Sequence, residues 1–282
     1  MTNKILFIAD VYANELPGGA ELVNDELISL LEIGGFEVVK AIAREITPDV
    51  LSFYRDTPII LGSFVSMRED TKNELASGKY KYVIYEHDHK YLPLRNPALF
   101  QNFEAPKNGI VNRTLYENAR MVACQTAMHE DIINRNLKLS NTSNLSSSLW
   151  GNDFLDAVLD IPVDKPRKFA AVIASTNPVK NQAGAEGFCK QKNYDYEVIS
   201  EPTPIELAKR LSQFDKLVFF PTVPESLGRT AVEAKMVGCG IITNNLLAVT
   251  KEPWFNLPRQ ELVQYLRDSR QKTVDVFLGA FE

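Results

Sequence analysis

The chain has 282 residues, 45% of them hydrophobic and 24% charged, which is ordinary for a globular protein and long enough for two domains of average size. Its formal net charge of −5 gives no reason to expect a nucleic-acid partner. The first apolar run stops before Asp10, too early for a secretory signal, and no segment approaches the roughly 18 to 20 apolar residues that span a bilayer. We therefore expect a cytoplasmic protein without an integral membrane segment, whose three separated cysteines are reduced and buried.

In the first half of the chain, short apolar runs alternate with amphipathic stretches, the pattern of β-α-β units and a parallel sheet. A helix is predicted over residues 19–33, where apolar side chains share one face and Gly34 and Gly35 follow as a stop. Further helices are predicted over residues 71–76, 110–118 and 127–134. The predicted strands cover residues 5–9, 37–41, 58–61, 82–86 and 121–124.

The composition of the chain changes near residue 140. Residues 140–148 are polar and low in complexity, and residues 161–166 are rich in turn-forming residues. We therefore expect an N-terminal domain over residues 1–150 and a C-terminal domain over residues 151–267, with a last helix at about 268–282 that can pack back on the first domain. A disordered tether is the alternative for residues 140–148, although the pair Leu149-Trp150 indicates partial burial.

The second half repeats the alternation of strands and helices. Strands are predicted over residues 169–174, 197–200, 216–220 and 240–243, and helices over residues 183–191 and 205–214. The tail from Leu257 is predicted to form one or two helices, broken near Ser269. No Gly-x-Gly-x-x-Gly follows the first strand, so a dinucleotide cofactor is not supported. The fold class expected is α/β, with two Rossmann-like domains built on parallel sheets.

The most informative segment runs from Pro221 to Lys235, between two apolar runs. It predicts a buried strand, a loop that holds Glu225, and a helix that begins near Gly228 and carries Glu233. A strand that leads through such a loop into a helix N-terminus forms an anion site, because unpaired amides and the positive end of the helix dipole face the ligand. A carboxylate repels phosphate but accepts hydrogen bonds from hydroxyls. A phosphate flanked by hydroxyls describes a nucleotide sugar.

Two motifs resemble those of retaining glycosyltransferases of the GT-B fold. Within this class, the resemblance is to family 4. The first is Glu225-Ser-Leu-Gly-Arg-Thr-Ala-Val-Glu233-Ala, in which Leu227 replaces the usual phenylalanine. The second is Leu16-Pro-Gly-Gly-Ala-Glu21, similar to the Gly-Gly turn after the family's first strand. The resemblance implies two Rossmann-like domains whose sheets face each other across a cleft, and sugar transfer without a metal ion.

The resemblance also implies roles for individual residues. Glu225 would bind hydroxyls of the transferred sugar, and Glu233 would accept hydrogen bonds from the ribose. Gly18 and Gly19 would let the backbone of the first domain approach the diphosphate, where a Cβ atom would collide. The distal phosphate or sugar would be held by the backbone amides of Ser226, Leu227, Gly228 and Arg229.

The charge of the diphosphate needs a cationic partner. The family supplies an arginine and a lysine after the first strand of the second domain; Lys180 matches the lysine, and no arginine precedes it. Arg229 could substitute for it, because a guanidinium can bind phosphate with two hydrogen bonds; the alternative is an ordinary exposed arginine. Lys180 is thus both a donor-binding and a catalytic candidate, together with Glu225.

The resemblance further implies a histidine after the fourth strand, near the donor sugar, and this is the third catalytic candidate. We choose His87, which would position hydroxyls or polarise the acceptor. On extended backbone His87 and His89 would share one face, with Glu86 and Asp88 on the other. Two imidazoles at this spacing can chelate a metal ion, but no third ligand is evident, so no metal site is expected. His129 is expected to be structural.

The predicted activity is transfer of a hexose from a UDP- or GDP-linked donor to an acceptor hydroxyl, with retention of configuration and no cofactor. The acceptor, whether glycan, small molecule, protein or lipid, is not specified by the sequence. Two alternatives stay open. One is a sugar-nucleotide epimerase on the same fold, and the other is a protein that binds nucleotide sugars without catalysis.

Overall fold

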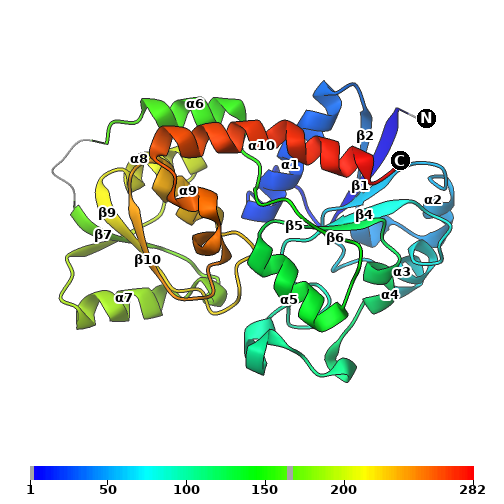
Figure 1. Cartoon of the computed structure of the whole chain (residues 1–282), viewed down its shortest axis with the longest axis horizontal. Coiled ribbons are helices and arrows are strands. Elements are labelled where there is room, and N and C mark those ends of the chain that lie inside the picture. The colour runs from blue at the N-terminus through cyan, green and yellow to red at the C-terminus, as the bar shows by residue number, and fades with distance from the viewer. Residues whose placement is uncertain (1–2, 164–167) are drawn as a thin grey trace. The chain divides into compact units, whose positions relative to one another are not determined.

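The computed structural model describes residues 3–163 and 168–282 (Figure 1). The chain divides into two compact units. Unit 1 comprises the residues up to Leu149 together with Ser269–Glu282, and unit 2 comprises Trp150–Asp268. Residues 164–166 of the turn-rich segment lie outside the described residues.

Unit 1 is built on a six-stranded parallel sheet with the order β2-β1-β3-β4-β5-β6. The chain adds β2 on one side of β1 and all later strands on the other side. Its strands are β1 (Lys4–Ala9), β2 (Glu37–Ile42), β3 (Ile59–Leu61), β4 (Tyr82–Tyr85), β5 (Met121–Cys124) and β6 (Thr142–Asn144).

Helices cover both faces of this sheet. The helices are α1 (Gly19–Ile33), α2 (Pro48–Ser52), α3 (Glu69–Leu75), α4 (Arg113–Glu117) and α5 (Ala127–Leu137). Because side chains alternate along a strand, Ile5 and Phe7 of β1 lie in one apolar cluster and Leu6 and Ile8 in another. The buried face of α1 belongs to the first cluster, and the second contains apolar residues of α2 to α5.

Unit 2 is built on a four-stranded parallel sheet with the order β10-β9-β7-β8. Here β8 is added on one side of β7, and β9 and β10 on the other. The strands are β7 (Lys168–Ile173), β8 (Tyr196–Ile199), β9 (Phe214–Phe219) and β10 (Gly240–Thr243).

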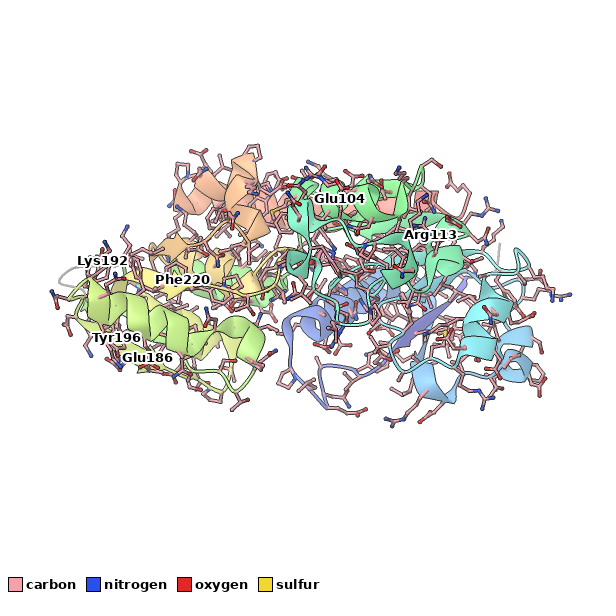
Figure 2. The ribbon with its side chains drawn as sticks, turned by 90° about the horizontal axis from the view of Figure 1, so that it is seen from below. Glu104, Arg113, Glu186, Lys192, Tyr196 and Phe220 are labelled. Carbon is pink, nitrogen blue, oxygen red and sulfur yellow. The ribbon has the colours of Figure 1, made fainter. Side chains whose placement is uncertain are left out.

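The two faces of the second sheet are covered unequally. Helices α6 (Asn152–Asp160), α8 (Pro204–Leu211) and α9 (Arg229–Met236) contribute to the larger core, and α7 (Gln182–Gln191) covers the other face (Figure 1). Tyr196 of β8 donates its hydroxyl hydrogen to Glu186 of α7 at 3.1 Å (Figure 2). Phe220, also labelled there, packs against Phe188 of α7 with ring centres 5.0 Å apart.

The last helix, α10 (Arg259–Gly279), is continuous, so the predicted break near Ser269 is wrong. No glycine or proline interrupts it before Gly279, and the Thr273 hydroxyl donates to the Ser269 carbonyl at 2.9 Å within the helix. Within the described parts of the chain, no helix is both long and apolar enough to cross a membrane.

The structure differs from the sequence prediction at four further places, namely β6, α2, α6 and Phe214. β6 was not predicted and contradicts the disordered-tether alternative; its polar residues suit a strand at the edge of the sheet. The short α2 and the helix α6 were also missed. Phe214, predicted as the end of a helix, begins β9, because it pairs with Lys168 of β7.

Candidate functional site

The candidate site lies in unit 2, where the chain leaves two adjacent parallel strands. Strand order reverses at β7, and ligands of open α/β sheets bind outside the carboxyl ends of the strands at such a switch point. The turn after β7 (Pro178–Lys180) ends at Lys180, and the loop after β9 carries Glu225. The Thr222 amide donates to the Val179 carbonyl at 2.9 Å and joins the two segments.

Lys180 and Glu225 are separate candidates in the sequence, and the structure places their side chains in contact at this switch point. The Lys180 Nζ lies 2.8 Å from the Glu225 Oε1, and it also lies 5.7 Å from the centre of the Phe219 ring. The lysine side chain is 40% exposed and the glutamate side chain 14%, so the pair borders solvent on the lysine side. The ammonium group can bind an anion, and the carboxylate beside it can accept a hydrogen bond from a hydroxyl.

The backbone of Glu225 is fixed by the segment after β10. Its amide donates to the Leu246 carbonyl at 2.9 Å, and its carbonyl accepts from the Ala248 amide at 3.3 Å. The Asn244 side-chain amide donates to the Pro221 carbonyl at 2.8 Å, which ties the start of the same loop to that segment. The carboxylate therefore projects from a loop held on both sides rather than from a free surface turn.

Helix α9 begins immediately after Gly228, whose φ of 91° is in the left-handed region. A Cβ atom at this position would lie 2.3 Å from the Leu247 Cδ1, so both conformation and space require glycine. The backbone amides of Leu227, Gly228 and Thr230 donate no hydrogen bond to any residue that the structure describes. These groups are the amides that a helix start leaves available for an anion.

Glu233 lies one turn into α9 and is buried. Its Oε1 accepts a hydrogen bond of 2.9 Å from the indole nitrogen of Trp150 and lies 3.4 Å from a guanidinium nitrogen of Arg229. Sequence reasoning placed Glu233 and Arg229 correctly on one helix but missed Trp150. The only signal for it in the sequence is a tryptophan beside the domain boundary, which indicates burial.

Gly18, Gly19 and His87 belong to unit 1. Gly18 has an ordinary φ of −81°, but a Cβ atom there would lie 2.3 Å from the Glu21 Oε2. The Glu21 carboxyl, whose pKa burial raises, thus lies against the Gly-Gly turn at the start of α1. The described contacts explain Gly18 by the space that Glu21 needs, and its predicted role toward a diphosphate stays a prediction.

His87 is buried, with 8% of its surface exposed. Its Nε2 lies 2.9 Å from the Asn24 Oδ1 of α1, and its ring lies 4.4 Å from that of Tyr85. Burial lowers the pKa of His87 to about 4, and the positive charge of Lys90 acts in the same direction. His87 is therefore a neutral imidazole near pH 7, able to position a hydrogen-bonding group but not to serve as a cation.

The expected alternation of side chains after β4 is wrong, because the strand ends at Tyr85 and His89 has a φ of 60°. The His89 ring lies 5.0 Å from that of His129, and both side chains are buried. The carboxylate of Glu86 is also buried and pairs with Lys90 at 3.2 Å. No cluster of three or more metal-binding side chains occurs in residues 3–163 and 168–282.

The switch point of unit 1, between β1 and β3, is filled by Asp10. Its carboxylate accepts hydrogen bonds from the amides of Val65 at 2.8 Å and Ser66 at 2.7 Å, and from the hydroxyls of Ser63 and Ser66. Burial opposes ionisation, yet these hydrogen bonds lower the pKa of Asp10. An anion would meet a carboxylate here, whereas at the switch point of unit 2 it would meet Lys180.

Comparison with known proteins places the fold. No family model matches the chain, and no curated protein matches it in sequence. A glycosyltransferase from Rickettsia africae is similar in structure over 100% of this chain and 94% of its own, with a TM-score of 0.58 and 11% identity. HepE from Anabaena, solved with UDP and glucose, is similar over 99% of this chain and 95% of its own, with a TM-score of 0.50 and 15% identity.

An alpha-glucosyltransferase solved with UDP and a 13-mer DNA is similar over 99% of this chain and 95% of its own, with a TM-score of 0.52 and 11% identity. The predicted fold class is confirmed: the chain has two α/β units on parallel sheets and the GT-B fold of these glycosyltransferases. At such identities the likeness establishes the fold alone.

Proposed function

We propose that this chain, which has the GT-B fold, is a glycosyltransferase whose unit 2 binds a nucleoside diphosphate sugar. One observation carries the proposal: Lys180 and Glu225 lie 2.8 Å apart, beside the start of α9, at the switch point of a parallel sheet. Similar folds solved with UDP support the choice of ligand class.

Each part of the donor has a matching group in unit 2. The diphosphate binds Lys180 and the amides of the α9 start, where the helix dipole favours negative charge. Glu225 accepts hydrogen bonds from hydroxyls of the transferred sugar, and Glu233 accepts them from the ribose. Ser226, Leu227, Gly228 and Arg229 complete the donor contacts, and the Gly18-Gly19 turn is proposed as a further diphosphate contact.

The proposed reaction transfers a hexose with retention of configuration and without a metal ion. The bond between the anomeric carbon and the diphosphate oxygen breaks, and the acceptor oxygen bonds to the same face of that carbon. The departing phosphate takes the acceptor's proton, while Lys180 and the helix dipole stabilise its negative charge. His87 is proposed to position hydroxyls as a neutral imidazole. A cytoplasmic location is proposed because all three cysteines are free and buried.

The first test is a thermal-shift screen against nucleoside diphosphates and their sugars, repeated with EDTA. A ligand at about 100 times its Kd raises the free energy of unfolding by about 2.7 kcal/mol. We expect UDP- or GDP-linked sugars to stabilise the wild-type protein with or without EDTA. Loss of the effect in EDTA would contradict metal independence, and no stabilisation by any nucleotide would contradict the donor site.

The second test follows turnover. Donor and candidate acceptors are incubated with the protein, and the anomeric configuration of the product is read by NMR. A product with the donor's configuration supports retaining transfer. Donor binding without transfer or hydrolysis would instead support the non-catalytic alternative, and a changed sugar still linked to nucleotide would support the epimerase.

A further inference from the structure

Trp150 is the first residue of unit 2, yet its side chain reaches a predicted donor-binding residue 83 positions later. The indole is 2% exposed and donates its N–H to the Glu233 Oε1 at 2.9 Å. The indole N–H is the only hydrogen-bonding group of a tryptophan side chain, and it is used here. A buried donor aimed at one oxygen of a buried carboxylate fixes the rotation of that carboxylate.

Arg229 completes the arrangement from the same helix as Glu233. A guanidinium nitrogen lies 3.4 Å from the Glu233 Oε1, and the guanidinium carbon lies 4.4 Å from the centre of the Trp150 ring. The side chains of Arg229 and Glu233 are 12% and 5% exposed. The arginine thus contacts both partners and compensates a carboxylate that would otherwise be costly to bury.

The contacts to Glu233 are unequal at its two oxygens. Both the indole and the guanidinium are directed at Oε1. No residue within the described parts of the chain donates a hydrogen bond to Oε2. A carboxylate with one oxygen held and the other available is suited to accept from a pair of neighbouring hydroxyls.

We infer that Trp150 is a positioning residue for nucleoside recognition. Together with Arg229 it holds the Glu233 Oε1, so that Oε2 is presented to the 2′- and 3′-hydroxyls of a ribose. The inference rests on the proposed donor site and adds its specificity: unit 2 selects ribonucleotides over nucleotides that lack these hydroxyls. Trp150 acts only through Glu233 and touches no reacting atom.

The test compares two ligands in two proteins. Binding of UDP and GDP, each beside its 2′,3′-dideoxy form, is measured by calorimetry for wild type and Trp150→Phe. Because hydrogen bonds to charged groups are the strong ones, we expect the wild type to bind the ribonucleotide about 10-fold or more tightly than the dideoxy form. We expect Trp150→Phe to lose most of this preference and to bind the dideoxy form as the wild type does.

Two outcomes would overturn the inference in distinguishable ways. In the first, Trp150→Phe loses the same affinity for both ligand forms, or loses none. Trp150 would then have only a packing role, and the proposed donor site would still stand. If the wild type binds neither UDP nor GDP, the proposed function falls and the inference falls with it.

Trp254→Phe is the matched control. Trp254 is the only other tryptophan of the chain; it is buried in unit 2 and stacks on Tyr265 with ring centres 5.4 Å apart. We expect this variant to keep the full preference for ribonucleotides. It also leaves Trp150 as the only tryptophan, so fluorescence offers a measurement that does not depend on how well Trp150→Phe folds. The ribonucleotide should change the emission more than its dideoxy form, and equal changes would contradict the inference.

Discussion

The Lys180 Nζ lies 2.8 Å from the Glu225 Oε1, although 45 residues separate the two in the chain. The pair forms because β7 and β9 are parallel neighbours, so the segments that follow them start from the same edge of the sheet. A diphosphate at the start of α9 would compete with Glu225 for the ammonium group. Donor binding is therefore expected to exchange or share this ion pair rather than to fill an empty site.

Lys180→Ala and Glu225→Ala should each lower turnover by about an order of magnitude or more. The first removes a cation that stabilises the negative charge of the leaving diphosphate, and the second removes a hydrogen-bond acceptor for the sugar hydroxyls. Stability should fall only modestly, since the pair is partly exposed, with the lysine side chain 40% and the glutamate side chain 14% exposed. Turnover and thermal unfolding are measured together. Lys192→Ala, at the exposed end of α7 (Figure 2), is the control and should keep full activity. Wild-type rates in both site variants would refute the assignment.

Gly228→Ala should destabilise the protein by about 1 to 3 kcal/mol and weaken donor binding, because its φ is 91° and a Cβ would collide with Leu247. Gly187, inside α7, offers a control of opposite sign. A Cβ there meets nothing within 4 Å, so Gly187→Ala should stabilise by about 0.5 to 1 kcal/mol. Urea unfolding measures both. A neutral Gly228→Ala would contradict the described turn.

His87 should make stability depend on pH. Its folded-state pKa of about 4 lies below the ordinary 6.5, so the unfolded chain binds the proton more readily as the pH falls. The contribution of the neutral His87 to the free energy of unfolding is fully present above about pH 6.5, and it is lost as the pH falls toward 4. Between pH 7 and pH 5 the wild type should lose about 2 kcal/mol more than His87→Gln, as measured by urea unfolding at each pH. An imidazole that titrates by NMR near 6.5 would contradict the buried, neutral state.

Lys90 should be essential to unit 1, because it compensates the buried carboxylate of Glu86. Burial opposes ionisation of Glu86, but Lys90, His129 and Tyr116 together lower its pKa. Lys90→Met leaves this charge unpaired and should cost about 3 to 5 kcal/mol, while Lys90→Met with Glu86→Leu should recover part of the loss. Lys4→Met removes the exposed pair with Glu37 and should cost less than about 1 kcal/mol. Equal, small effects at Lys90 and Lys4 would show that Glu86 is not buried as described.

The periodicity of apolar residues predicted most helices and strands. The errors fall where strand pairing determines the secondary structure. The helix over residues 19–33 has the predicted bounds, because its apolar face and terminal glycines are local signals. Phe214 was misassigned, since an apolar residue after a helix pattern fits either element until a neighbouring strand is known. β6 was missed, since an edge strand needs fewer apolar residues than a central one.

The sequence by itself determined the two parallel-sheet units and the helix that carries Glu233 behind the loop of Glu225, because each depends on residues close together in the chain. Only the tertiary structure decided that Lys180 meets Glu225, that Trp150 holds Glu233, and that Asp10 fills the switch point of unit 1. These contacts join residues separated by about 45 to 83 positions, and strand order and register, which bring such residues together, are set by packing over the whole unit.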